Sequence, residues 1–167
     1  MRILGIDPGY AIVGFGVLDY NGVDFKPVSF GAITTKAGVE FAKRLKEIFD
    51  GMNEIFDKYK IDAMSIEKLY FNTNTTTAID VAEARGVILL SAKLHGVPIY
   101  EYTPLQVKQS ISGYGRAEKT QIIEMTKNIL KLQKAPKPDD TADALALAVC
   151  HGHTAFSLLG LLNERAK

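Results

Sequence analysis

The chain has 167 residues, of which 47% are hydrophobic and 23% charged, as expected for one globular domain with a sizeable core. It contains no apolar run near the ~20 residues of a membrane span and no recognisable signal peptide, so we expect a cytoplasmic protein with no membrane association. The net charge of +1 hides a basic middle, because residues 85–137 carry nine Lys+Arg against three Asp+Glu, a bias that can face phosphates.

The first third of the chain predicts three antiparallel strands in a meander. Short apolar runs separated by turn residues are typical of consecutive strands, and here they occupy 2–7, 11–20 and 23–35. The dipeptide Asn21-Gly22 between the second and third runs is a strong hairpin signal.

The remaining chain predicts helices alternating with two further strands. Apolar residues recur at helical spacing through 39–59, and "DAMSIEK" at 62–68 and "VPIYEY" at 97–102 predict strands. Further helices are expected at 75–95 after a threonine cap, from Thr103-Pro104, after the loop "GYG" at 113–115, and from Asp139 to His151. We therefore predict an α/β fold in one domain, 1–167, with 154–167 as a loose tail. Its five-stranded mixed sheet has three antiparallel strands, then parallel ones, and is flanked by helices.

Four acidic residues stand where apolar elements begin or end. Asp7 ends the first strand, and Glu67 ends the fourth after the apolar "AMSI". Asp140 and Asp143 lie three residues apart at the start of the last helix, so they share one face. That helix is otherwise apolar, so it should pack on the sheet with its acidic face toward the strand ends.

Each carboxylate taken alone also has an ordinary structural explanation. Asp7 could cap the turn that follows it, and Glu67 could be a surface residue at a strand end. Asp139 or Asp140 could be the N-cap of the last helix. Asp143 fits such an explanation least, since it lies inside an apolar stretch.

Taken together, the four carboxylates indicate a cation site. Several buried carboxylates in one place would repel each other and raise each other's pKa, whereas a divalent cation removes that cost and prefers oxygen ligands. Two Mg²⁺ ions ~4 Å apart can clamp the attacking water and the leaving oxygen of a phosphodiester. This chemistry needs acidic residues and no nucleophilic side chain, which suits a chain with one cysteine and no obvious Ser–His pair.

The motifs "GIDPG", "SIEKLYFNTN", "EARG", "YTPLQVKQSISGYGRAEKTQI" and "DDTADALALAV" together resemble the RuvC-type Holliday junction resolvases of the ribonuclease H-like superfamily. The resemblance covers residues 2–153 in the family's order and spacing. It implies a homodimeric endonuclease of homologous recombination and DNA repair, which cuts four-way junctions by paired symmetric nicks. It implies two Mg²⁺ per subunit, for which Mn²⁺ substitutes, and RuvA and RuvB as branch-migration partners.

The same resemblance assigns roles to individual residues. It makes Asp7, Glu67, Asp140 and Asp143 the catalytic and metal-binding acids, with Asp139 as a helix cap rather than a ligand. Five residues are implied DNA contacts: Tyr70, Arg85, Lys108, Arg116 and Lys119. Tyr70 would stack on an unpaired base near the crossover. Arg85 is equally well explained by a buried salt bridge, and Arg116 by a solvated loop.

Ala78, Ala82 and Gly86 recur every four residues in the helix at 75–95, and small side chains let another helix approach closely. By resemblance this helix forms the dimer interface, while the spacing alone equally allows packing on the protein's own sheet.

Three other functions are compatible with parts of the pattern. A nuclease of the same fold that trims ribosomal RNA precursors would share the first strand, but not the "EARG" and "VKQ…AEK" blocks. An actin-like phosphotransferase needs two nucleotide-binding halves and a longer chain. A catalytically inactive junction-binding module would gain nothing from a full set of carboxylates, which weaken DNA binding.

Overall fold

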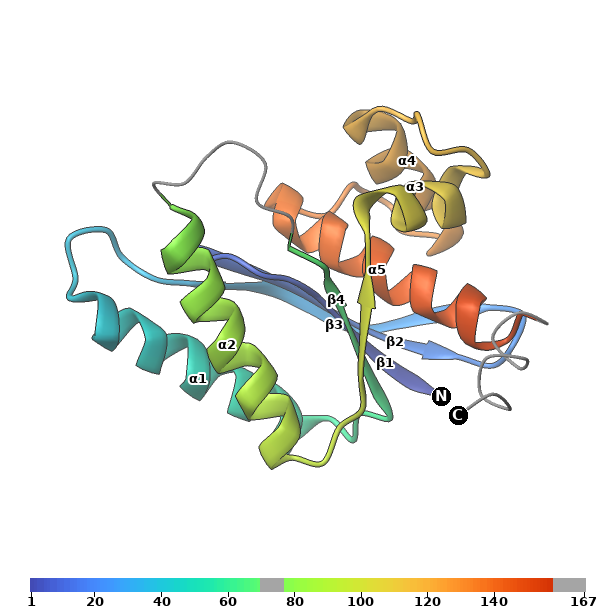
Figure 1. Cartoon of the computed structure of the whole chain (residues 1–167). Helices are drawn as coiled ribbons and strands as arrows, with labels where there is room; N and C mark the ends of the chain where they lie inside the picture. Colours follow the sequence, from blue (N-terminus) through green and yellow to red (C-terminus); the bar gives the residue numbers. More distant parts are fainter. Residues whose placement is uncertain (70–76, 158–167) are drawn as a thin grey trace.

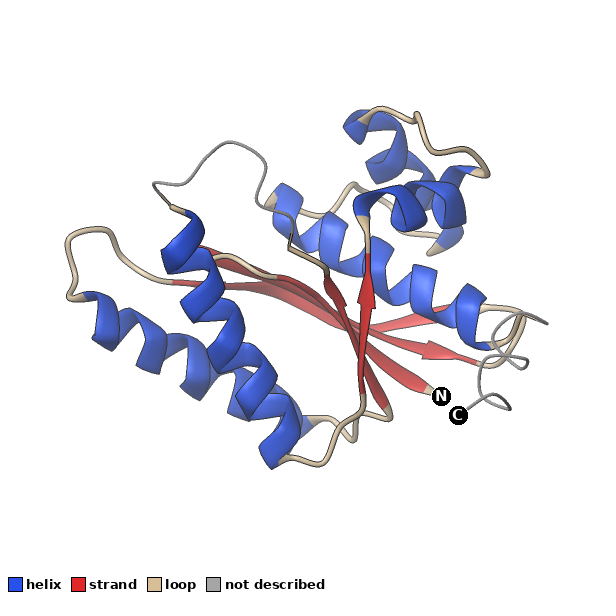
Figure 2. Cartoon of the chain, in the orientation of Figure 1, coloured by secondary structure: helices blue, strands red, loops and turns tan. Residues whose placement is uncertain are grey.

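A computed structural model describes residues 1–69 and 77–157 of the chain. A five-stranded sheet in the order β3-β2-β1-β4-β5 forms its centre (Figures 1 and 2). The strands β1 (Arg2–Asp7), β2 (Ile12–Tyr20) and β3 (Phe25–Thr34) are antiparallel. The β4 strand (Ala63–Glu67) pairs in parallel with β1, and β5 (Ile99–Tyr102) pairs in parallel with β4. The predicted mixed sheet is confirmed.

Helices cover both faces of this sheet (Figure 1). They are α1 (Phe41–Lys58), α2 (Ala78–Leu94), α3 (Pro104–Ser112), α4 (Lys119–Ile129) and α5 (Asp139–Ala155). The α1 and α2 helices share a core with residues such as Leu4 and Ile6 of β1, whereas Ile3 belongs to the core beneath α3, α4 and α5. None of the helices in the described ranges is both long and apolar enough to cross a membrane.

The α5 helix lies almost directly on the backbone of β1 and β2. A Cβ atom added to Gly5 would fall 1.9 Å from the carbonyl oxygen of Ala144, and one added to Gly14 would fall 2.0 Å from that of Asp140. Only glycine permits so close an approach, which is one reason for glycine inside a strand. These glycines therefore set the height of α5 above the sheet.

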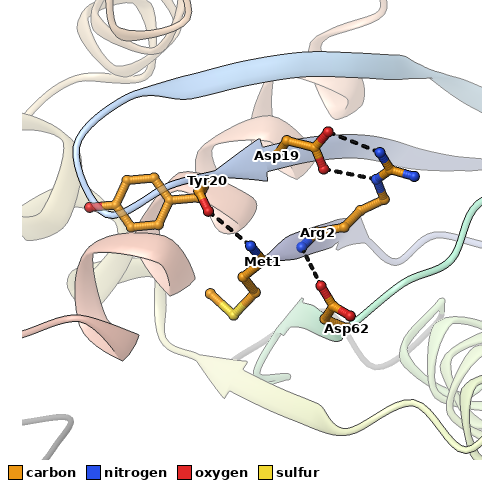
Figure 3. A network of polar contacts seen from close by, with 5 residues as sticks. All are labelled: Met1, Arg2, Asp19, Tyr20 and Asp62. Carbon is orange, nitrogen blue, oxygen red and sulfur yellow. Dashed lines mark hydrogen bonds and ion pairs between the residues drawn. The ribbon is translucent and has the colours of Figure 1, made fainter.

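A polar network fixes the opposite end of the central strand (Figure 3). The Arg2 guanidinium makes a two-pronged ion pair with Asp19 of β2, at 2.8 and 2.9 Å, and its backbone N–H donates to Asp62 just before β4. The terminal ammonium of Met1 donates to the Tyr20 carbonyl at 2.9 Å. Arg2 thus links β1 to β2 and to the residue before β4, and helps fix the register between these strands.

The helix starts were predicted with mixed success. Thr103 caps α3 as expected, since its side chain and that of Gln106 form a reciprocal capping box. Thr77 precedes α2 but makes no side-chain cap bond. The α5 helix begins after Pro138 without a side-chain cap and runs to Ala155, four residues beyond the expected end. Part of the expected tail at 154–167 is therefore helical, and 158–167 lie outside the described residues.

Candidate metal-dependent nuclease site

Two of the predicted acids stand side by side at one edge of the sheet. The β1 and β4 strands run parallel with Ile6 opposite Ile66, so Asp7 and Glu67 follow at adjacent carboxyl ends, about 5 Å apart by strand spacing. Side chains alternate between faces along a strand. Asp7 therefore shares the face of Gly5, which is the face that α5 covers.

The first turns of α5 supply the other two acids. Asp140 lies above Gly14 of β2, and Asp143 is three residues later on the same face of the helix. Asp143 lines a cavity together with Glu67, which places the helix carboxylate beside the strand carboxylate. Residues from β1, β4 and α5, far apart in the sequence, thus lie at the same edge of the sheet.

The acids at this edge of the sheet are crowded and partly buried, and both conditions raise carboxyl pKa values. Burial, and then the negative charges of Asp143, Glu67 and Asp140, raise the pKa of Asp7 to about 7. Burial and Asp143 also raise the pKa of Glu67. The anionic forms of these groups are therefore costly until a cation compensates them.

Lys119, the first residue of α4, supplies part of that compensation. Its ammonium donates to Asp143 Oδ2 at 2.7 Å, and this bond raises the pKa of Lys119. The same positive charge opposes the rise in the pKa of Asp7 and of Glu67. Lys119 therefore belongs to the carboxylate site itself, rather than to a remote basic surface.

The donor set fits a divalent metal ion, although the carboxylates do not yet form a closed shell. Within residues 1–69 and 77–157, no three acidic, histidine or cysteine side chains converge closely enough to hold an ion as they stand. Asp143 is instead paired with Lys119 Nζ at 2.7 Å. Carboxylate oxygens are nevertheless ligands that Mg²⁺ and Mn²⁺ prefer, and a bound cation would offset the burial and repulsion that raise the pKa of Asp7 and Glu67.

Asp139 and Asp140 differ in their surroundings. Asp140 contributes to the raised pKa of Asp7, so it faces the other acids. Asp139 is bound to Lys137 Nζ at 2.8 Å, and this bond lowers the pKa of Asp139. The prediction that Asp139 caps the helix is wrong, since its side chain makes no cap bond.

A cavity of about 270 Å³ opens beside the acids. Its polar rim contains Glu67, Asp143, Lys108 and Lys119, and its walls are the apolar side chains of α3, α4 and α5, namely Pro104, Val107, Ile122 and Leu147. Sequence reasoning did not find these wall residues, because an apolar residue lining a cavity has the same helical spacing as one in the core.

The predicted DNA contacts fall in different environments. Lys108 and Lys119 lie at the cavity rim, and Arg116 is exposed in the loop between α3 and α4. The Arg85 side chain is only 14% exposed and is paired with Glu101. Tyr70 lies outside the described residues.

We predict that the metal-free protein loses stability relative to its Asp7→Asn variant as pH rises from about 4 to about 8. Because the pKa of Asp7 is raised from 3.8 to about 7 in the folded chain, folding binds a proton in this range, and its stabilising effect disappears above pH 7. Asp7→Asn should remove the contribution of Asp7 to the pH dependence and stabilise the metal-free chain at pH 8 by up to about 4 kcal/mol, at ~1.4 kcal/mol for each unit by which the pKa differs. Urea unfolding in EDTA at pH 5 and pH 8 measures both effects. Equal destabilisation of the two proteins between these pH values would contradict the assignment.

Comparison with known proteins gives this geometry a family. Residues 3–151 match the family model described as crossover junction endodeoxyribonuclease RuvC. Proteins of that name from Brevibacillus brevis and Alkaliphilus metalliredigens are 60% and 56% identical to the chain, over 90% and 92% of its length and 91% and 94% of theirs.

Comparison of the fold with solved structures supports the same family. The structure described as Thermus thermophilus RuvC in complex with a Holliday junction substrate superposes with a TM-score of 0.87 at 30% identity. The match covers 95% of this chain and 98% of that one. The chain therefore belongs to the RuvC family of crossover junction endodeoxyribonucleases.

Proposed function

We propose that this protein resolves Holliday junctions during homologous recombination and DNA repair, by paired symmetric nicks made through metal-dependent phosphodiester hydrolysis. One observation carries the proposal: four carboxylates from β1, β4 and α5 gather at one sheet edge, next to a basic cavity rim. Acids alone would repel DNA, so this combination favours a site that holds cations and cuts the phosphate backbone. The junction in the Thermus thermophilus structure supports the same substrate.

The residues that would hold the metal are Asp7, Glu67, Asp140 and Asp143. When bound, two Mg²⁺ per subunit, or Mn²⁺ in their place, activate a water and stabilise the leaving 3′-oxygen, so that the product carries a 5′-phosphate. Burial and three acidic neighbours raise the pKa of Asp7, so we assign it the central role in holding the metal.

The basic groups at the cavity rim have a complementary task. Lys119 pairs with Asp143, and a cation held by Asp143 would leave the Lys119 ammonium available to a DNA phosphate. Lys108 lies on the same rim and can bind the backbone beside the cut. We propose Arg116 as a further phosphate contact and Tyr70 as the side chain that stacks on an unpaired base.

We propose a homodimer that uses α2. The helix packs on α1 through its buried side, where Ser91 Oγ donates to Asn53 Oδ1 at 2.7 Å. Its other side carries Ile79, Gly86, Leu90 and Leu94 at helical spacing, and these residues are exposed, Ile79 by 68% and Leu94 by 65%. A Cβ at Gly86 would meet nothing within 4 Å, so Gly86 does not pack on the chain's own sheet and leaves room for another helix.

We predict that Leu90→Glu converts the dimer to a monomer. The substitution puts a charge in the middle of the apolar stripe on α2, where Leu90 is 55% exposed, so the fold itself should tolerate it. Analytical ultracentrifugation should show a dissociation constant at least ~100-fold weaker, corresponding to ~3 kcal/mol. Leu105→Glu, at a 54% exposed position on α3, is the matched control and should remain dimeric. An unchanged dimer in the first variant would place the interface elsewhere.

We also propose that the whole chain, 1–167, forms one nuclease domain that acts in the cytoplasm together with RuvA and RuvB. The partners are proposed from the family alone.

Cleavage of a synthetic four-way junction with Mg²⁺ tests the proposed function. The protein should nick two strands of like polarity at symmetric positions, and the nicks should be sealed by ligase. A linear duplex of the same sequence should be cut far more slowly. If both are cut equally, the protein is a general nuclease and the proposal is wrong.

A further inference from the structure

We infer that Arg85 is a positioning residue that holds the catalytic end of β4, rather than a DNA contact. The inference rests on the proposed function for the role of Glu67, and goes beyond it by assigning a task to a residue of α2. It starts from the position of Arg85, whose side chain is 14% exposed although it belongs to a surface helix.

The guanidinium of Arg85 connects three elements. Its Nη2 atom forms an ion pair with Glu101 Oε1 of β5, and its Nε donates to the backbone carbonyl of Glu67 at 3.4 Å. The backbone N–H of Lys68 donates to Tyr102 at 2.8 Å, which ends the β4–β5 ladder at the same point. Arg85 therefore ties α2 to the last residue of β4 and to β5.

The helix that carries Arg85 is a firm anchor. Ala84 and Ile88, on the inner side of α2, are fully buried in the core beneath the sheet. The β4 strand ends at Glu67, whose carboxylate belongs to the proposed metal site. A tether from a fixed helix to this strand end restricts the backbone of the residue whose carboxylate must meet a metal ion.

The same contacts disfavour a phosphate contact by Arg85. Its guanidinium already pairs with a carboxylate, and a phosphate would have to displace Glu101. Glu101 is itself 40% exposed, so DNA approaching here would also meet its negative charge.

Arg85→Met should therefore weaken metal binding without weakening DNA binding. Groups that orient metal ligands typically contribute 10–100-fold to metal affinity, so we expect the Mg²⁺ concentration that gives half of the thermal stabilisation to rise about tenfold. Glu101→Gln should raise the same midpoint less, since it loosens Arg85 without removing it. Arg85→Lys should partly restore it. Lys46→Met, which removes an exposed ion pair from α1, is the control and should leave the midpoint unchanged.

Two measurements separate the possible roles. The first is thermal unfolding in a Mg²⁺ titration, repeated in a Glu67→Gln background, where Arg85→Met should no longer move the midpoint if it acts through Glu67. The second is junction binding in EDTA across a range of salt concentrations. Weaker binding with a shallower salt dependence and an unchanged midpoint would make Arg85 a DNA contact. A lower melting temperature with both quantities unchanged would make it merely structural. Either result overturns the inference.

The unfolding assay does not depend on cleavage. If the wild-type protein fails to cut a junction but Arg85→Met still shifts the Mg²⁺ midpoint through Glu67, the positioning role stands and the proposed substrate is wrong. If the midpoint stays fixed while the wild type resolves junctions, only the positioning role is wrong.

Discussion

Asp7→Asn should bind a four-way junction as tightly as the wild type and fail to cut it. Asp7 is the acid that the other three surround, and its pKa is raised to about 7 by burial and by their charges. Asparagine keeps the shape but removes the negative charge that would hold a cation. We expect the cleavage rate to fall by at least ~10³-fold, beyond the ~10²–10³ lost with a single transition-state donor. Single-turnover cleavage and a binding assay in EDTA measure the two properties separately.

The neighbouring acids provide the controls for this experiment. Glu67→Gln and Asp143→Asn should behave like Asp7→Asn, because each removes one oxygen ligand from the same group. Asp139→Asn is the matched control, since it makes the same chemical change next to Asp140 at a residue paired with Lys137. It should keep cleavage within about twofold. A wild-type rate for Asp7→Asn, or a lost rate for Asp139→Asn, would contradict the assignment.

The sequence predicted the positions of the acids because those positions depend on local patterns. A carboxylate at the end of an apolar strand is visible from the strand alone, and parallel pairing of β1 and β4 then brings Asp7 beside Glu67. The three-residue spacing of Asp140 and Asp143 places both on one helix face in the same way. These arguments need only the period of each element and the order of the strands.

Contacts between elements far apart in the sequence could not be predicted from such local patterns. Whether Arg85 would meet Glu101 or DNA depends on how α2 lies against β5, and both readings were open from the sequence. The Lys119–Asp143 ion pair likewise depends on the packing of α4 on α5. A motif could identify Lys119 as basic and near DNA, but not as a counter-ion of the acids.

The glycines inside the first two strands were not used in any prediction from the sequence. Gly5 and Gly14 lie in strands, where glycine weakens pairing unless another backbone comes close. That other backbone is α5, whose Ala144 and Asp140 carbonyls lie on these glycines. The apolar "ALALAV" indicated packing on the sheet, but its height above the sheet is fixed by residues more than a hundred positions earlier.

Gly14→Ala should therefore abolish cleavage although it touches no acidic side chain. The new Cβ would lie 2.0 Å from the carbonyl oxygen of Asp140, 2.3 Å from its carbon and 3.0 Å from the nitrogen of Thr141. All three are backbone atoms of α5, so the helix must move as a body. We expect the free energy of unfolding to fall by about 3 kcal/mol and Asp140 and Asp143 to leave the other acids. Urea unfolding and single-turnover cleavage measure the two effects.

Gly31→Ala separates displacement of α5 from a general effect of alanine in this sheet. Its Cβ would meet only the Phe15 ring, at 3.2 and 3.3 Å, and a ring can shift by a few tenths of an ångström. Gly31→Ala should lower the free energy of unfolding by less than about 1 kcal/mol and leave the cleavage rate unchanged. If a folded Gly14→Ala protein still cuts at the wild-type rate, close seating of α5 does not position its acids. If Gly14→Ala loses cleavage but still binds the junction without metal, the added methyl group on β2 acts by displacing α5. This helix carries two of the four carboxylates, so its position on the sheet is then required for cleavage.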